Sequence, residues 1–180
     1  MVVLSTAVSK RQETVFNSAC ARIWLFACGS LFLLAGSLSV AQASDEVDAL
    51  LLRSDAPPGI VFEIVEGDES ALEELLPVVR SAIARVRARF PQTEFAVVSH
   101  GREEFALQTE YQGEYTQIHQ QVQSLVAEDV PVHVCETHAS WYGVSADDFP
   151  EYVDVAPTGP GQIQLYLEMD YELIVIQPSN

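Results

Sequence analysis

Cys135 and its neighbours are the part of this sequence best suited to chemistry. Residues 130–134 alternate apolar valines with other residues, and the pattern changes at Cys135, after which Thr137 and further polar or aromatic residues lead to Gly143. This predicts a buried strand that delivers Cys135 to the start of a helix. A helix N-terminus favours the thiolate form of a cysteine because it presents partial positive charge. We therefore expect a reactive thiol here, with a buried, inert cysteine as the alternative.

Three histidines could assist this thiol. His133 lies two residues before Cys135, so on a strand its side chain points to the same side. His138 follows three residues later, within about one helical turn, and His100 ends a neighbouring strand. A histidine can hold a thiolate as an ion pair or carry its proton. We expect His138, or else His100, to tune Cys135, so the predicted catalytic residues are Cys135, His138 and His100.

Two other uses of one cysteine and several histidines are weaker. Cys-x-x-His could bind zinc or copper, but no second cysteine lies nearby to strengthen the pattern, and we assign no metal and no cofactor. A papain-like hydrolase needs a histidine far downstream of its cysteine, and no histidine follows His138 in this sequence.

The first 43 residues have the features of a secretory signal peptide. Lys10, Arg11 and Arg22 precede an uncharged apolar run over 23–40, and Ala41-Gln42-Ala43 then provides the small residues that a signal peptidase accepts. We expect cleavage after Ala43 and a periplasmic or secreted protein. The alternative is an uncleaved membrane anchor, since the run is just long enough to span a bilayer.

Cleavage would change both the balance of charged residues and the number of cysteines in the chain. Residues 44–180 contain six arginines, no lysine and twenty-five acidic residues, which makes nucleic acid and anionic membranes poor partners. Cys20 and Cys28 would leave with the signal peptide, so Cys135 would be the only thiol. A lone cysteine in an oxidising compartment indicates either reactivity or intermolecular pairing.

Hydrophobic periodicity predicts one α/β domain. Residues 44–58 are expected to be a flexible lead-in, and residues 59–180 the domain. Apolar runs predict strands over 60–65, 94–99, 131–135, 152–155 and 172–176. Helical spacing predicts helices over 70–89, 115–127 and 162–170, with a short turn of helix after Ser145. Ser70 with Glu73, and Ser145 with Asp148, are expected to form capping boxes.

Alternation of strands and helices predicts a mostly parallel five-stranded sheet with helices on both faces. Ligands of such sheets bind beyond the carboxyl ends of the strands, which is where His100 and Cys135 are expected. The sequence contains no Gly-x-Gly-x-x-Gly or Walker-type loop, so nucleotide chemistry has no support.

Several segments resemble the DsrE/DsrF-like family, which includes sulfur-relay subunits of the TusD type. The matching segments are Val132-His-Val-Cys135, Thr137 through Val144, Phe149 through Val155, Pro157-Thr-Gly159, Gln162-Ile163 and Asp170 through Ile176. The resemblance covers roughly residues 58–178. It implies a compact α/β sandwich that assembles into oligomers, here expected to be a homo-oligomer. It also implies that Cys135 accepts and passes a persulfide sulfur, with a sulfur donor or acceptor protein as partner. The alternative within this family is a non-catalytic oligomeric or small-ligand-binding module.

Overall fold

The structure is a computed structural model that describes residues 41–178, so most of the expected signal peptide 1–43 lies outside the described residues. The strands are β1 (Gly59–Ile64), β2 (Glu94–Ser99), β3 (Val132–Cys135), β4 (Asp154–Ala156) and β5 (Tyr171–Ile176). The α-helices are α1 (Ala41–Leu51), α2 (Leu72–Arg89), α3 (Thr116–Ala127), α4 (Glu136–Ser140) and α5 (Gly159–Glu168). The 3₁₀ helices are η1 (Glu69–Ala71), η2 (Arg102–Leu107), η3 (Thr109–Tyr111) and η4 (Ala146–Asp148).

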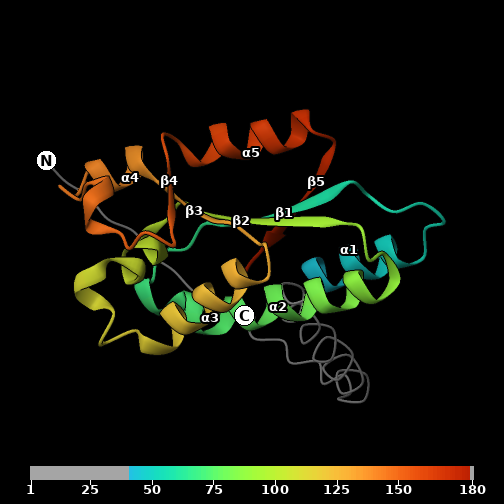
Figure 1. Cartoon of the computed structure of the whole chain (residues 1–180), viewed down its shortest axis with the longest axis horizontal. Helices are drawn as coiled ribbons and strands as arrows, with labels where there is room; N and C mark the ends of the chain where they lie inside the picture. The colour runs from blue at the N-terminus through green and yellow to red at the C-terminus, as the bar shows by residue number, and fades with distance from the viewer. Residues whose placement is uncertain (1–40, 179–180) are drawn as a thin grey trace, which may run out of the picture. The chain divides into compact units, whose positions relative to one another are not determined.

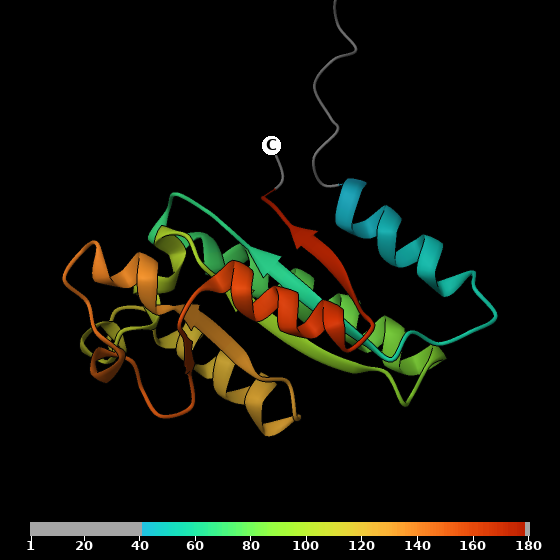
Figure 2. The same cartoon turned by 90° about the horizontal axis from the view of Figure 1, so that it is seen from above.

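The five strands form one parallel sheet in the order β4-β3-β2-β1-β5, which confirms the predicted fold class. The α2 and α3 helices cover one face, and α5 covers the other (Figure 1). The chain steps outward from β1 to β4 and then returns to the far side of β1. Because parallel crossovers keep one hand, this reversal of direction places α5 on the opposite face. Seen from above, α5 lies over the sheet and runs roughly along its strands, and α1 lies beside β5 (Figure 2).

Both faces of the central strands are buried, as expected for strands between helical layers. On the α2 and α3 side, Phe62 and Ile64 of β1 join a large apolar core with the inner stripes of both helices. On the α5 side, Val61 of β1 joins a smaller core that contains Ile163 and Tyr166. Successive residues of a strand point to opposite faces, so this division assigns Cys135 and His133, two residues apart, to the α5 side.

The expected flexible lead-in over 44–58 is wrong in its first half. Residues 44–51 belong to helix α1, whose Val47 and Leu50 side chains are buried in the large core. Exposed ion pairs lie beside this packing: Asp48 of α1 contacts Arg85 of α2, and Arg53, two residues past the helix, lies 2.5 Å from Glu172 of β5. The apolar spacing Val47, Leu50, Leu51 is helical, but the acidic composition around it concealed the pattern.

One of the two expected capping boxes is present. Ser145 and Asp148 bond reciprocally at the start of η4. At α2 the expectation was wrong, because Asp68 accepts the N–H of Ser70 to cap η1, and α2 then begins at Leu72 without a side-chain cap. Asp68, one residue before this short 3₁₀ helix, therefore provides the side-chain cap that was expected from Ser70.

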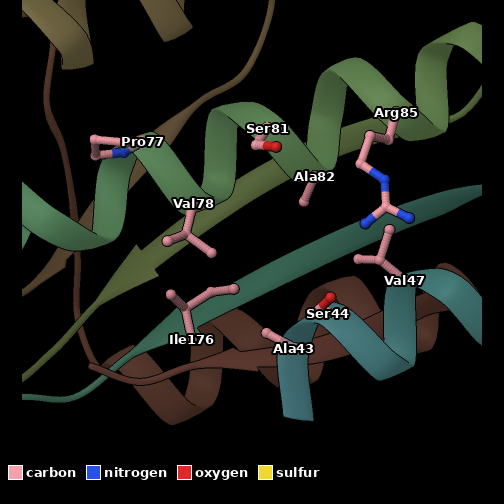
Figure 3. A pocket seen from close by; sticks show the side chains of 9 residues that line it. All are labelled: Ala43, Ser44, Val47, Pro77, Val78, Ser81, Ala82, Arg85 and Ile176. Atoms are coloured by element: carbon pink, nitrogen blue, oxygen red, sulfur yellow. The ribbon is translucent and has the colours of Figure 1, made fainter. Parts of the chain in front are cut away.

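A shallow, mostly apolar groove of about 310 Å³ lies between α1 and α2 (Figure 3). Side chains of α1, α2 and the end of β5 line it, among them Val47, Val78, Arg85 and Ile176. None of Cys135, His138 and His100 belongs to its lining. Within residues 41–178 we find no helix with the length and apolar character needed to cross a bilayer.

Docking of α1 can be tested with a matched pair of leucines. Leu50 is 3 % exposed, whereas Leu52 is 88 % exposed. We expect Leu50→Ala to lower the free energy of unfolding by about 2 to 3 kcal/mol, because it removes buried contacts and leaves a cavity. Leu52→Ala should change it by less than about 0.5 kcal/mol. Urea denaturation of both variants measures this, and equal effects would show that α1 is not part of the folded core.

Candidate functional site

Cys135 sits at the strand–helix junction that the sequence predicts. It is the last residue of β3 and the N-cap of α4, two elements that can be followed in Figure 1. Its Sγ accepts the backbone N–H of His138 at 3.3 Å, so the sulfur takes the place that a capping oxygen usually has. The residue is only 5 % exposed. A hydrogen-bond donor is therefore already directed at the sulfur.

Glu104 of η2 links the cysteine to His138. One carboxylate oxygen accepts the backbone N–H of Cys135 at 2.8 Å, and the other lies 2.7 Å from Nδ1 of His138. The Glu104 side chain is fully buried. A single carboxylate thus holds both the backbone of the thiol residue and the imidazole ring. Sequence reasoning missed Glu104, and the available signal was the apolar Phe105–Leu107 directly after two glutamates.

Glu103 fixes the loop that carries Glu104. Its carboxylate accepts the Ser99 hydroxyl at 2.7 Å, the Gly101 N–H at 2.9 Å and the Glu66 N–H at 2.6 Å. Glu103 is also fully buried. Several hydrogen bonds to one buried carboxylate offset the cost of removing it from water. The loop after β2 is therefore rigidly tied to the ends of β1 and β2.

Aromatic rings surround His138. Phe105 stacks on the imidazole with centroids 5.3 Å apart, and Tyr142 and Trp141 meet it edge-on at 5.3 Å and 5.6 Å. The Arg102 guanidinium lies 5.5 Å from the centre of the Tyr142 ring. With Nδ1 directed at Glu104 and the ring packed on three sides, the imidazole has a defined orientation.

His100 directly follows β2, the strand next to β3, and its side chain pairs with Glu63. Its Nε2 is 2.8 Å from a carboxylate oxygen of Glu63, and a Cβ added to Gly159 would lie 2.5 Å from the His100 Cβ. The β2–β3 ladder pairs Ser99 with Val134, so one further step places His100 beside Cys135. Across residues 41–178 no hydrogen bond joins the two residues.

His133 belongs to the packing beneath α5. Its Nε2 is 2.8 Å from the Tyr166 hydroxyl, and its ring is buried. Burial lowers the pKa of His133, and the Asp154 carboxylate acts in the opposite direction. The structure therefore gives this histidine a place in the smaller core, while His138 has the connection to Cys135 through Glu104.

Burial raises the pKa of Glu104 to about 7 from its ordinary value of 4.5. The neighbouring Glu103 adds to this, while the hydrogen bonds from Cys135 and His138 oppose it. The same carboxyl group lies 2.7 Å from Nδ1 of His138, so the two groups share a hydrogen bond. The arrangement is suited to taking up or releasing a proton near neutral pH.

Glu104 should make folding stability depend on pH. Its folded pKa is raised, so between pH 4.5 and about 7 the folded protein keeps a proton that the unfolded chain has lost. Stability from this group therefore falls as pH rises through that window, by at most roughly 3 kcal/mol, and is level above it. Urea unfolding at pH 5, 6, 7 and 8, comparing the protein with Glu104→Gln, isolates the contribution. Parallel curves for the two proteins would contradict it.

Within residues 41–178 there is no group of three or more His, Cys, Asp or Glu side chains spaced to hold a metal ion. The chemistry that the residues themselves support is that of a nucleophilic thiol. Cys135 supplies the sulfur, a backbone N–H is directed at it, and Glu104 holds both the Cys135 backbone and the His138 ring.

Comparisons with known proteins address the fold. No protein-family model matches the chain, and no curated protein does. A solved structure titled as that of a protein of unknown function, MTH1491 from Methanobacterium thermoautotrophicum, matches with a TM-score of 0.52 and 27 % sequence identity. The match covers 65 % of this chain and 97 % of that one. This supports the α/β architecture.

Proposed function

We propose that this protein is a DsrE-like sulfur carrier in which Cys135 accepts a persulfide sulfur and passes it on. The observation that carries the proposal is the link from Cys135 to His138 through the buried Glu104 carboxylate. The resemblance of residues 58–178 to the DsrE/DsrF-like family adds the sulfur chemistry. The single cysteine among residues 41–178 also favours it, since no neighbouring thiol can resolve the persulfide into an intrachain disulfide.

The transfer itself needs no outside oxidant. The Cys135 thiolate attacks the outer sulfur of a donor R–S–SH, the donor S–S bond breaks, and R–S⁻ leaves. The proton lost by Cys135 ends on the departing thiolate, so the products are Cys135–S–SH and R–SH. The reverse steps deliver the sulfur to an acceptor thiol. We assign the proton transfer to the His138–Glu104 pair, and the N–H of His138 stabilises negative charge on Sγ.

Mass spectrometry tests the proposal directly. The protein is incubated with inorganic polysulfide and weighed intact under non-reducing conditions. We expect an increase of about 32 Da, the mass of one sulfur atom, that disappears with dithiothreitol. Cys135→Ser should show no such adduct, and a circular dichroism spectrum confirms that this variant folds. Absence of the adduct on the unaltered protein, with both inorganic polysulfide and a peptide cysteine persulfide as donors, would refute a sulfur carrier.

A non-catalytic oligomeric or small-ligand-binding module is the second candidate. It is favoured by the low exposure of Cys135, which is 5 %. Thiol labelling distinguishes a sulfur carrier from a non-catalytic module. A carrier thiol should react with a small alkylating reagent in the native protein, while a buried structural cysteine reacts only at the rate of unfolding. Labelling rates with and without urea give the answer.

Export and self-association complete the proposal. We propose that residues 1–43 are a signal peptide and that the mature protein begins at Ser44 in the periplasm or outside the cell. Intact mass of the exported form checks this, since a mass that includes residues before Ser44 would mean a tethered protein.

We also propose a homo-oligomer, favoured by exposed apolar side chains such as Leu165, Leu173 and Val175. Sedimentation analysis measures its size.

A further inference from the structure

Two large aromatic side chains are exposed next to the candidate thiol. Trp141 is 74 % exposed and Tyr142 is 53 % exposed. Both rings contact His138, which is bonded to the carboxylate that holds Cys135. Exposed tryptophan and tyrosine are enriched at protein–protein interfaces, where they supply most of the binding energy. We call Trp141 and Tyr142 the aromatic rim of the site.

The surroundings of the aromatic rim are acidic. Arg102, whose guanidinium lies over Tyr142, is paired with Glu69 at 2.6 Å. Glu136 is exposed on α4 itself. The cation nearest the aromatic rim is therefore already neutralised, and the net charge of the whole chain is −17.

This charge distribution discriminates between sulfur donors. Free polysulfide and low-molecular-weight persulfides with carboxylates are anions, and an acidic surface lowers their local concentration. A donor cysteine on a positively charged protein segment is attracted instead, and complementary charge mainly raises the rate of association. The exposed aromatic side chains then provide the short-range contact that a free anion has no surface to use.

We propose that the sulfur partner of Cys135 is a cysteine persulfide on a positively charged protein segment that docks on the aromatic rim. This rests on the proposed sulfur-carrier function. The segment delivers its outer sulfur to Cys135 by the balanced exchange given above and leaves as a thiol. The acidic residues steer the encounter, and Trp141 and Tyr142 hold the docked segment.

Two synthetic donors test the proposal. Both are nine-residue peptides with one central cysteine persulfide, and they differ only in carrying four lysines or four glutamates. Transfer to Cys135 is followed by rapid quenching and intact mass. At low salt we expect the lysine peptide to react at least about tenfold faster, with an advantage that shrinks in 0.5 M NaCl. Equal rates at low salt would overturn the proposal.

Variants localise the effect to the aromatic rim. Trp141→Ala should reduce the rate with the lysine peptide by about tenfold relative to its rate with inorganic polysulfide. Leu52→Ala, an exposed apolar residue directly after α1, is the matched control and should leave that ratio unchanged. Glu136→Gln on α4 should weaken the salt dependence more than Glu46→Gln on α1. Identical behaviour of rim and control variants would exclude docking at the aromatic rim.

The result also separates the two proposals. If inorganic polysulfide adds sulfur to Cys135 but the peptides show no preference, the carrier function stands and the basic partner does not. If no donor adds sulfur to Cys135, both are refuted.

Discussion

Glu104→Ala is expected to lower the free energy of unfolding by roughly 2 to 4 kcal/mol at pH 5 and to slow sulfur uptake by Cys135 at least about tenfold. The stability loss follows because the Cys135 N–H and Nδ1 of His138 both lose a buried partner. The rate loss follows because the imidazole is no longer held in place to move the proton of the thiol. Urea denaturation and quenched mass spectrometry measure the two effects.

The pH of the stability measurement matters for Glu104→Ala. At pH 5 the raised pKa of Glu104 keeps the carboxyl group neutral in the folded protein. At pH 8 the unaltered protein bears the cost of a buried charge that the variant lacks, so the difference between them should be smaller there. A difference that grows with pH would contradict the assigned direction of the pKa shift.

Glu104→Gln is the conservative control. An amide can still accept the Cys135 N–H and donate to a neutral His138 nitrogen, so most of the stability should return. The ability to take up a proton does not return, so sulfur uptake should remain slow and lose its dependence on pH near 7. A merely structural role for Glu104 predicts full recovery of the rate in this variant.

Gly101→Ala is expected to destabilise the protein by about 3 kcal/mol. A Cβ at this position would lie 2.6 Å from both the backbone N and the backbone O of Glu66, and it would also contact the Glu103 carboxylate. Backbone atoms at the end of β1 cannot move aside cheaply, so the bonds of Glu103 to the ends of β1 and β2 should break. Thermal and urea denaturation measure the loss.

Gly113→Ala is the matched control for Gly101→Ala. No atom lies within 4 Å of a Cβ added at Gly113, and its φ is not positive. Its stability should be unchanged or raised by less than about 1 kcal/mol. Because η2 carries Glu104, Gly101→Ala should also speed hydrogen exchange at the Cys135 amide, and Gly113→Ala should not. Equal exchange rates would mean that the Glu103 loop does not hold the site.

Much of the site's framework could be predicted from local pattern. The change from alternating valines to polar residues at Cys135 correctly indicated a strand followed at once by a helix, and the alternation of elements indicated the parallel sheet. Both are short-range properties, because strand and helix periods are read from residues only a few positions apart. The strand ends His100 and Cys135 followed from the same information.

The side chains that contact Cys135 could not be predicted from local sequence pattern. Glu104 is thirty-one residues from Cys135 in sequence, and in a charged stretch it reads as a solvated surface residue. Its burial depends on Glu103 tying the loop to two strand ends and on Phe105 packing against His138. Likewise, the burial of α1 could not be predicted locally, because it requires the apolar surface of α2 and β5.

The local sequence determined that Cys135 lies where a strand of a parallel sheet ends and a helix begins. Which groups contact Cys135 and His138 was decided only by tertiary structure, because both residues converge on a buried carboxylate from a loop thirty-one residues away from Cys135. That convergence selected His138 over His133 as the histidine connected to Cys135, and it left Trp141 and Tyr142 exposed beside the thiol.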